Sequence, residues 1–254
     1  MNLDLASSIA LVAIPVVVSV AYAGRLALRG RATSARVERE GHSALLAKGV
    51  MEMFHWALAP VGRACVRAGI TANAITFASL ALGLAAGVAV AAGHLGAGAL
   101  LAALCSVGDA LDGVVARLSR RASEAGEVLD AAVDRYTELA LLGGLAVHLR
   151  YDVRLLVLTL LAICASFMVS YSTAKAEALG VTPPRGSMRR SERAVCLVLG
   201  TALAPVAAEL LGERSAIAPV ALALLLVAVA GNISAVRRLT AVARAADAKG
   251  APAE

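Results

Sequence analysis

The chain has 254 residues, of which 59% are hydrophobic and only 17% are charged. This composition excludes an ordinary soluble domain and is typical of a helical protein with several membrane spans. The net charge of +6 does not indicate nucleic-acid binding, because the basic residues lie beside apolar segments without interleaved aromatic residues. Anionic membrane lipids and a phosphorylated substrate explain these basic residues better.

The first 47 residues are expected to form an anchor helix and a cytoplasmic linker, separate from the domain that follows. Residues 6–24 are an apolar run of spanning length, preceded by Asp4 and by no Lys or Arg, so a cleaved signal peptide is not expected. Residues 25–47 are polar and of mixed charge. Residues 48–69 place apolar and basic positions at near-helical spacing around Trp56, which predicts an amphipathic helix in the membrane interface.

Six further apolar segments are long enough to cross a membrane. They are residues 73–93, 96–117, 128–148, 155–174, 194–211 and 216–236. Most of the 24 Lys and Arg residues fall in segments that alternate onto one side, which places that side in the cytoplasm of an inner cell membrane. The expected fold is therefore an all-α membrane bundle: six core transmembrane helices in a domain over 48–240, an extra N-terminal transmembrane helix, an interfacial helix and a flexible tail over 241–254.

Four aspartates lie within or beside two of these spans. Asp109 and Asp112 are three residues apart, and Asp130 and Asp134 are four apart, so each pair shares one face of a helix. An ionised Asp at the centre of a membrane helix costs about 2.5–3.5 kcal/mol, so the four carboxylates need a counter-charge. The short polar hairpin between the pairs makes the two helices antiparallel, which brings all four side chains to the same cytoplasmic end of the bundle.

Two sources of counter-charge are open at this point. Carboxylates without Cys or His suit Mg²⁺ or Mn²⁺, and two such ions commonly sit between carboxylates and substrate phosphates. The alternative is that Arg117 and Arg135 neutralise the acids as buried ion pairs, although this does not explain why Gly113 and Gly126 accompany them.

The pattern D-x2-D-G-x2-A-R-x8-G-x3-D-x3-D is complete in this chain. It resembles the signature of the CDP-alcohol phosphotransferase family, which consists of integral membrane enzymes of phospholipid synthesis, and the resemblance covers roughly residues 50–240. It implies transfer of a phosphatidyl group from a CDP-linked lipid to a polar alcohol, with release of CMP. The signature residues are Asp109, Asp112, Gly113, Ala116, Arg117, Gly126, Asp130 and Asp134.

The resemblance implies a role for each of these residues. Asp109, Asp112 and Asp130 are expected to hold the metal ions, while Asp134 is expected to take the proton from the acceptor hydroxyl and to touch a metal. The nucleotide is expected to contact Gly113, Ala116, Arg117 and Gly126, with pairing to the acids as the other reading for Arg117. Upstream, Asn73 and Thr76 resemble the family's P-N-x-x-T motif with Ala72 in place of Pro, and are expected to act as helix cap and nucleotide contact.

Residues 170–193 resemble the corresponding segment of phosphatidylinositol-phosphate synthases. Inositol 1-phosphate is therefore the favoured acceptor, although Thr173 and the Pro183-Pro184 pair depart from that pattern. Arg side chains match phosphate oxygens well, but a cluster that anchors the helix to anionic lipids is the other reading for Arg189 and Arg190. The residues expected to bind the acceptor are Ser170, Lys175, Arg189, Arg190 and Arg193.

Other functions are weighed against this one. A phosphatidylglycerophosphate synthase that uses glycerol 3-phosphate belongs to the same reaction class. An ion-coupled transporter would also carry acids within the membrane, but the acid motif is not repeated in the second half of the chain. A catalytically silent lipid-binding protein would not need all eight signature residues. Family members are often dimers, so a homodimer is expected from the resemblance.

Overall fold

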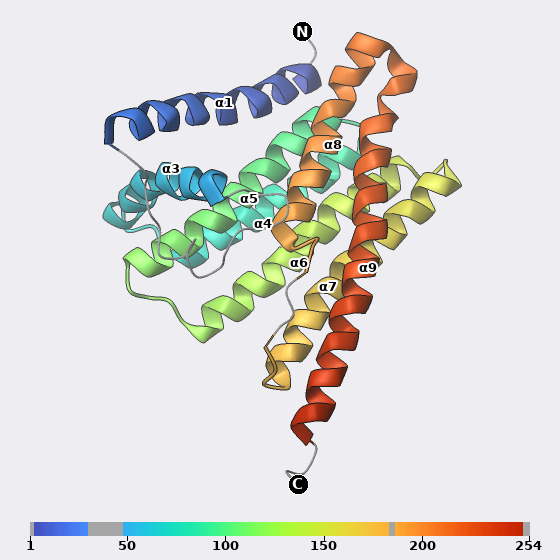
Figure 1. Ribbon diagram of the computed structural model, residues 1–254. Coiled ribbons are helices and arrows are strands. Elements are labelled where there is room, and N and C mark those ends of the chain that lie inside the picture. Colours follow the sequence, from blue (N-terminus) through green and yellow to red (C-terminus); the bar gives the residue numbers. More distant parts are fainter. Residues whose placement is uncertain (1–2, 30–47, 183–185, 251–254) are drawn as a thin grey trace.

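The computed structural model describes residues 3–29, 48–182 and 186–250, and over these ranges it is all-helical (Figure 1). This confirms the predicted all-α class. The helices are α1 (Leu3–Arg29), α3 (Lys48–Arg67), α4 (Ala72–Ala91), α5 (Leu95–Leu118), α6 (Glu124–His148), α7 (Val153–Ala178), α8 (Arg190–Leu211) and α9 (Ile217–Gly250), with the short 3-10 helix η1 (Glu213–Ser215) before α9. The predicted linker falls mostly on residues 30–47, outside the described ranges.

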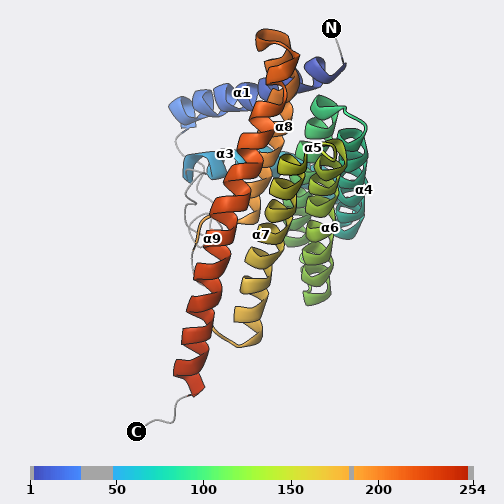
Figure 2. The ribbon, with the colours of Figure 1, turned by 90° about the vertical axis from the view of Figure 1, so that its right-hand side faces the viewer.

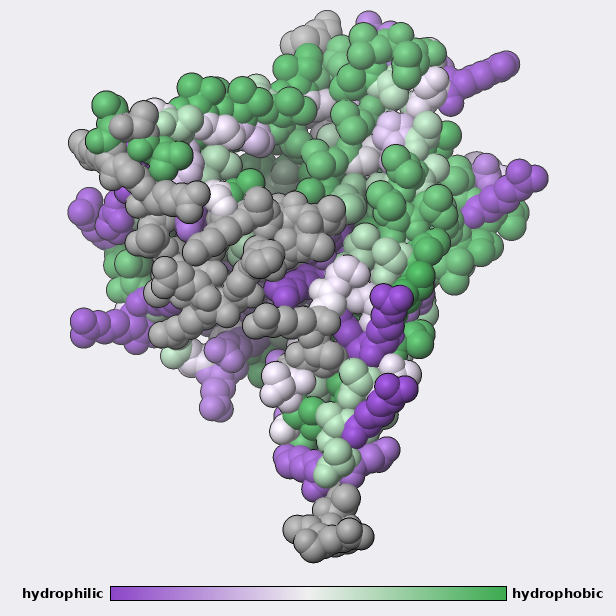
Figure 3. Space-filling model, viewed as in Figure 1, coloured by the Kyte–Doolittle hydropathy of each residue, from purple (hydrophilic) through white to green (hydrophobic). Residues whose placement is uncertain are grey.

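Six of the described helices are long and apolar enough to cross a membrane, namely α1, α4, α5, α7, α8 and α9. The remaining predicted span corresponds to α6, which has 25 residues but carries Glu124, Glu127 and Glu138 in addition to its two aspartates. These ionisable groups lower its mean hydropathy below that of the six candidate spans. Hydrophobic surface covers much of the bundle between hydrophilic side chains at its ends (Figure 3).

The core consists of two groups of three helices. Helix α4 packs closely against both α5 and α6, while α9 packs against α7 and α8. Contacts of α5 with α8 and of α6 with α7 join the groups. Figure 2 shows α4, α5 and α6 on one side and α7, α8 and α9 on the other. The central cluster of buried side chains draws on both groups, with Val90, Leu142 and Leu224 fully enclosed.

Small residues hold α6 tightly on α4. A Cβ at Gly87 would collide with the carbonyl of Ala140, and one at Gly144 would collide with the carbonyl of Gly87. Lipid supplies no hydrophobic drive between helices, so such a seam of small residues allows the close approach that stabilises the pair. It fixes the position of α6, and therefore of its aspartates, relative to α4.

Helix α1 crosses the bundle obliquely (Figures 1 and 2). Its first turn lies on the start of α5, where Asp4 Oδ1 accepts a hydrogen bond from the Ala97 N–H at 3.0 Å. Its last turns reach α3, where the rings of Tyr22 and Trp56 are 5.6 Å apart. The N-terminal helix is therefore docked on the bundle at both of its ends.

Helix α9 continues to Gly250, into the region predicted as a flexible tail from 241. The Ala-rich sequence of this segment has a high helix propensity, which explains the extension. Its Lys249 Nζ donates hydrogen bonds to the carbonyls of Leu179 and Gly180 at the end of α7, at 3.2 and 3.3 Å. Residues 251–254 lie outside the described ranges.

Candidate functional site

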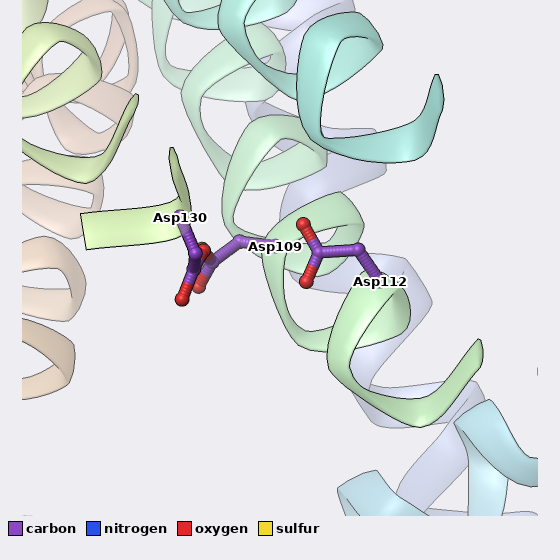
Figure 4. A group of neighbouring side chains, drawn as sticks. All are labelled: Asp109, Asp112 and Asp130. Atoms are coloured by element: carbon purple, nitrogen blue, oxygen red, sulfur yellow. The ribbon is translucent and has the colours of Figure 1, made fainter. Parts of the chain in front are cut away.

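Three of the four aspartates come together between α5 and α6. Oxygen atoms of Asp109, Asp112 and Asp130 all lie within 4.8 Å of one another, and their carboxylates face a common space (Figure 4). Asp112 is buried and the other two are half-buried. The hairpin over residues 119–123 reverses the chain, as the sequence predicts, so that antiparallel helices present these carboxylates at one end of the bundle.

Helix α4 orients the buried member of this cluster. Thr76 Oγ1 donates a hydrogen bond to Asp112 Oδ2 at 2.6 Å, and both side chains are buried. The position of Thr76 follows from the start of α4, where Thr71 Oγ1 accepts from the Ala74 N–H. The helix cap is therefore Thr71 and not Asn73 as predicted, because Thr71 has the extended backbone of a cap residue while exposed Asn73 already lies inside the helix.

The fourth aspartate pairs with an arginine from the other helix group. Arg190 Nη2 lies 2.6 Å from Asp134 Oδ1, and Arg190 Nη1 donates to Asp109 Oδ2 at 2.6 Å. Of the alternative partners, Arg135 donates to the carbonyl of Ala131 on its own helix. The first turn of α8 thus supplies a positive charge that Asp109 and Asp134 share.

The negative charge of the aspartates exceeds the positive charge that Arg190 supplies, so divalent cations can bind there. Arg190 pairs with two of the four carboxylates, so its single positive charge only partly offsets the negative charge of the ionised cluster. Asp130 Oδ1 is buried and has no hydrogen-bond partner among the described residues. A buried acceptor without a donor is costly, and oxygen donors at this separation suit Mg²⁺ or Mn²⁺. The donor set therefore fits divalent cations at Asp109, Asp112 and Asp130.

A second ion pair lies one turn further into the bundle. Arg193 Nε and Nη2 donate to the two carboxylate oxygens of Glu138 at 2.7 and 2.8 Å, and Nη1 donates to the Met188 carbonyl at 2.8 Å. The Arg193 side chain is 0% exposed. The sequence analysis expects Arg193 to contact the acceptor; in the structure its guanidinium is enclosed and each of its nitrogens already has a protein partner.

The segment before α8 is tied to α9 by an arginine that the sequence analysis did not single out. Arg238 is 7% exposed, and its Nη2 donates to the carbonyl of Gly186 at 3.0 Å. Its buried Nε has no hydrogen-bond partner among the described residues. Ser234 Oγ donates to the Ser187 carbonyl at 2.7 Å. The signal was present in the sequence, because an ionisable residue within a membrane helix is by default a candidate functional residue.

The remaining predicted site residues are more dispersed. A Cβ at Gly113 would meet only the flexible end of Arg117, so space remains beside α5, and half-buried Ala116 follows one turn later on the same helix. Gly126 donates its N–H to Ser123 Oγ in the first turn of α6. In α7, Ser170 is half-buried and Lys175 is exposed on the last turn.

A cavity lies next to the aspartates, at the meeting point of the two helix groups. Residues of α4, α5, α6 and α8 line it, including Cys105, Thr137, Glu138 and Arg190. Most of its remaining lining is apolar. The two ion pairs formed by Arg190 and Arg193 therefore lie beside a space that side chains do not fill.

A family model described as CDP-alcohol phosphatidyltransferase matches residues 69–234. The phosphatidylinositol phosphate synthase of Corynebacterium glutamicum is 34% identical over 151 residues, which are 57% of this chain and 68% of that protein. The archaetidylinositol phosphate synthase of Pyrococcus horikoshii is 31% identical over 144 residues, which are 56% of this chain and 74% of that protein.

Solved structures with the same fold include two of the phosphatidylinositol phosphate synthase of Mycobacterium tuberculosis. One, with CDP-DAG bound, matches with a TM-score of 0.68 and 28% identity over 78% of this chain and 98% of that chain. The other, in complex with manganese and citrate, has a TM-score of 0.68 and 28% identity, and covers 77% and 93% of the two chains.

Proposed function

The chain belongs to the CDP-alcohol phosphatidyltransferase family, and from this premise we propose that it transfers the phosphatidyl group of CDP-diacylglycerol to an inositol phosphate, with release of CMP. The observation that carries the proposal is the group of three carboxylates within 4.8 Å of one another at one end of a membrane bundle. Membership of an enzyme family also removes the transporter and the silent lipid-binding protein as alternatives.

In the proposed mechanism, Asp109, Asp112 and Asp130 hold Mg²⁺ or Mn²⁺, with Thr76 fixing the orientation of Asp112. When bound, divalent cations there would neutralise the pyrophosphate and stabilise the charge on the departing CMP. The similarity to a synthase solved with manganese supports this choice of ion. Gly113 and Gly126 leave the α5 and α6 backbones open to the nucleotide.

Asp134 is the proposed general base. It takes the proton of the acceptor hydroxyl, whose oxygen then attacks the phosphorus that carries the lipid. The bond from that phosphorus to the bridging oxygen breaks, and the bridging oxygen leaves with CMP. Arg190 lies between Asp134 and Asp109, so its guanidinium holds the base next to the metal ligands and can donate to a phosphate oxygen.

The acceptor assignment rests on basic residues around the start of α8. Arg189 caps this helix and Arg190 is its first residue. Arg238 donates to the segment that precedes the helix, and its Nε has no hydrogen-bond partner among the described residues. A phosphorylated acceptor would use these charges, whereas a neutral alcohol would not. The relatives named as phosphatidylinositol phosphate and archaetidylinositol phosphate synthases favour inositol phosphate over glycerol 3-phosphate.

The location of the site is part of the same proposal. The basic hairpin at Arg117, Arg120 and Arg121 and the basic end of α9 lie at the aspartate end of the bundle, which by the positive-inside rule faces the cytoplasm of the cell membrane. The nucleotide is then delivered from the aqueous side and the lipid tails from the bilayer. A homodimer is an additional expectation carried from the family resemblance.

The test is a panel of acceptors. Membranes containing the protein receive CDP-diacylglycerol and Mn²⁺ with inositol 1-phosphate, free inositol, glycerol 3-phosphate or serine, and CMP and the lipid product are measured by mass spectrometry. Release of CMP with inositol 1-phosphate and a phosphatidylinositol phosphate product is expected. Turnover with glycerol 3-phosphate alone would replace the proposed acceptor, and no CMP release with any acceptor would refute the proposed reaction.

A further inference from the structure

Two ion pairs of the same kind connect α6 and α8, one turn apart. Helix α6 supplies Asp134 and Glu138, four residues apart, and α8 supplies Arg190 and Arg193, three residues apart. The outer pair involves the proposed base. The inner pair does not reach the aspartate cluster, and its arginine is 0% exposed.

Direct packing of α6 on α8 contributes little to the separation of these two helices. Among the described helices, α6 packs mainly on α4, and α8 packs on α9 and α5, but α6 and α8 do not form a closely packed pair. The cavity lies between them, lined by Thr137, Glu138 and Leu141 on one side and by Arg190 and Leu197 on the other. Because few direct contacts join α6 and α8, the hydrogen-bonded charges are the direct links between these two helices among the described residues.

The geometry of the inner pair suits it to hold α8 in a fixed position relative to α6. Arg193 reaches Glu138 through two parallel hydrogen bonds, an arrangement that fixes orientation as well as distance. Both partners are largely withdrawn from water, so the pair is screened little and loosening it would leave a buried charge unpaired.

Arg193 also controls the segment that leads into α8. Its Nη1 donates to the carbonyl of Met188, which is buried and has a φ of 57°. The left-handed conformation is unfavourable for a residue with a side chain, so it persists only where contacts hold it. Glu192 adds a second contact by accepting from the Arg189 N–H at 3.1 Å. Together these bonds fix where α8 starts, and Arg190 is its first residue.

We infer that Glu138 and Arg193 are a pair of positioning residues for phosphatidyl transfer: they hold α8 against α6 so that Arg190 meets Asp134 and Asp109. This inference rests on the proposed function, in which Asp134 is the base. Neither residue touches the substrate. Their removal therefore changes turnover and not the binding of either substrate.

The test compares Glu138→Gln and Arg193→Gln with a matched control. Gly200→Ala serves as the control, because its Cβ would lie 2.8 Å from the Pro219 carbonyl and so disturbs the packing of α8 on α9, away from α6. Each kcat is normalised to the amount of folded protein, measured by size-exclusion chromatography, and the thermal transition is recorded for every variant.

Each single variant is expected to lower kcat about 10- to 100-fold, the size of effect that a small misplacement of catalytic groups produces. The KM values for CDP-diacylglycerol and for the acceptor should stay nearly constant. The double variant Glu138→Gln/Arg193→Gln should lose no more than the worse single variant, because both changes remove the same interaction. Gly200→Ala should lower the thermal transition without changing the normalised kcat.

A second readout does not depend on activity. With the four cysteines replaced by alanine, spin labels at the exposed positions Glu127 of α6 and Ser191 of α8 report the separation of these helix ends. Glu138→Gln should broaden or shift this distance distribution, and Gly200→Ala should not. An unchanged distribution, an unchanged normalised kcat, or a rise confined to the acceptor KM would each overturn the inference. If Glu138→Gln shifts the distance distribution but the wild-type protein releases no CMP, the proposed function alone is refuted.

Discussion

The hydrogen bond from Thr76 to Asp112 should control how tightly the site binds metal. Thr76→Val removes the hydroxyl and keeps the shape of the side chain, so packing is nearly conserved. The bond is 2.6 Å long and both of its ends are buried, so water cannot replace the lost donor. Asp112 would then be free to rotate away from the position where it faces Asp109 and Asp130.

The size of the effect follows from the character of this bond. A hydrogen bond to a charged group contributes about 1.5–3 kcal/mol, and about 1.4 kcal/mol corresponds to a factor of ten. Loss of a partner that orients a metal ligand typically reduces metal affinity about 10- to 100-fold, which agrees with that range. The Mn²⁺ concentration that gives half-maximal CMP release should therefore rise by about one to two orders of magnitude in Thr76→Val.

The measurement is CMP release as a function of Mn²⁺ concentration at saturating substrates. At saturating Mn²⁺ the kcat of Thr76→Val should approach that of the wild type, because the hydroxyl orients a ligand and takes no part in the proton transfer. Thr201→Val is the matched control, since Thr201 is also buried but donates only to the Leu197 carbonyl of its own helix. Equal Mn²⁺ dependence in the two variants would refute the idea that Thr76 orients a metal ligand.

Three further predictions follow from the same geometry. Asp134→Asn should lower kcat about 10²- to 10⁴-fold, the contribution of a general base, while the protein remains folded and inserted; near wild-type CMP release would remove Asp134 from that role. Treatment with EDTA should abolish CMP release and lower the thermal transition, and Mn²⁺ or Mg²⁺ should restore both; a transition that does not respond to either ion would contradict metal binding at the aspartates. Gly87→Val should destabilise the protein by about 1–3 kcal/mol, because the added side chain meets the Ala140 carbonyl; a thermal transition equal to that of the wild type would mean that α4 and α6 are not held by this seam.

The acidic half of the site could be predicted from sequence because its logic is local. Asp109 and Asp112 share a helix face by spacing alone, and a short hairpin brings Asp130 to the same end of the bundle. Because ionised carboxylates within a membrane are energetically costly, a functional site that binds cations is the most direct explanation for them. The structure brings these three carboxylates together as expected, and their role as metal ligands is what the metal titrations test.

The basic half could not be predicted in the same way, because its partners are distant in sequence. Arg190 meets Asp109 across 81 positions, and Arg193 meets Glu138 across 55. Both arginines belong to one cluster of positive charge, and nothing in their spacing distinguishes an arginine that faces the site from one that is enclosed. Only the position and rotation of α8 in the bundle decide this, and these depend on contacts between helices that are distant in sequence.

The division between the two halves also suggests how the reaction is organised. The proposed metal ligands and their support come from α4, α5 and α6, which the glycine seam and close packing hold as one group. The basic segment proposed to meet the acceptor belongs to α8 and α9, which form the other group with α7. Donor and acceptor would thus be held by different groups of helices, and transfer requires that these groups be aligned.

Arg190 contacts the acids from the opposite group, and Glu138 of the neighbouring Glu138–Arg193 pair lines the same cavity as Arg190. A substitution that shifts one group against the other should therefore slow transfer even where every residue that contacts a substrate is intact.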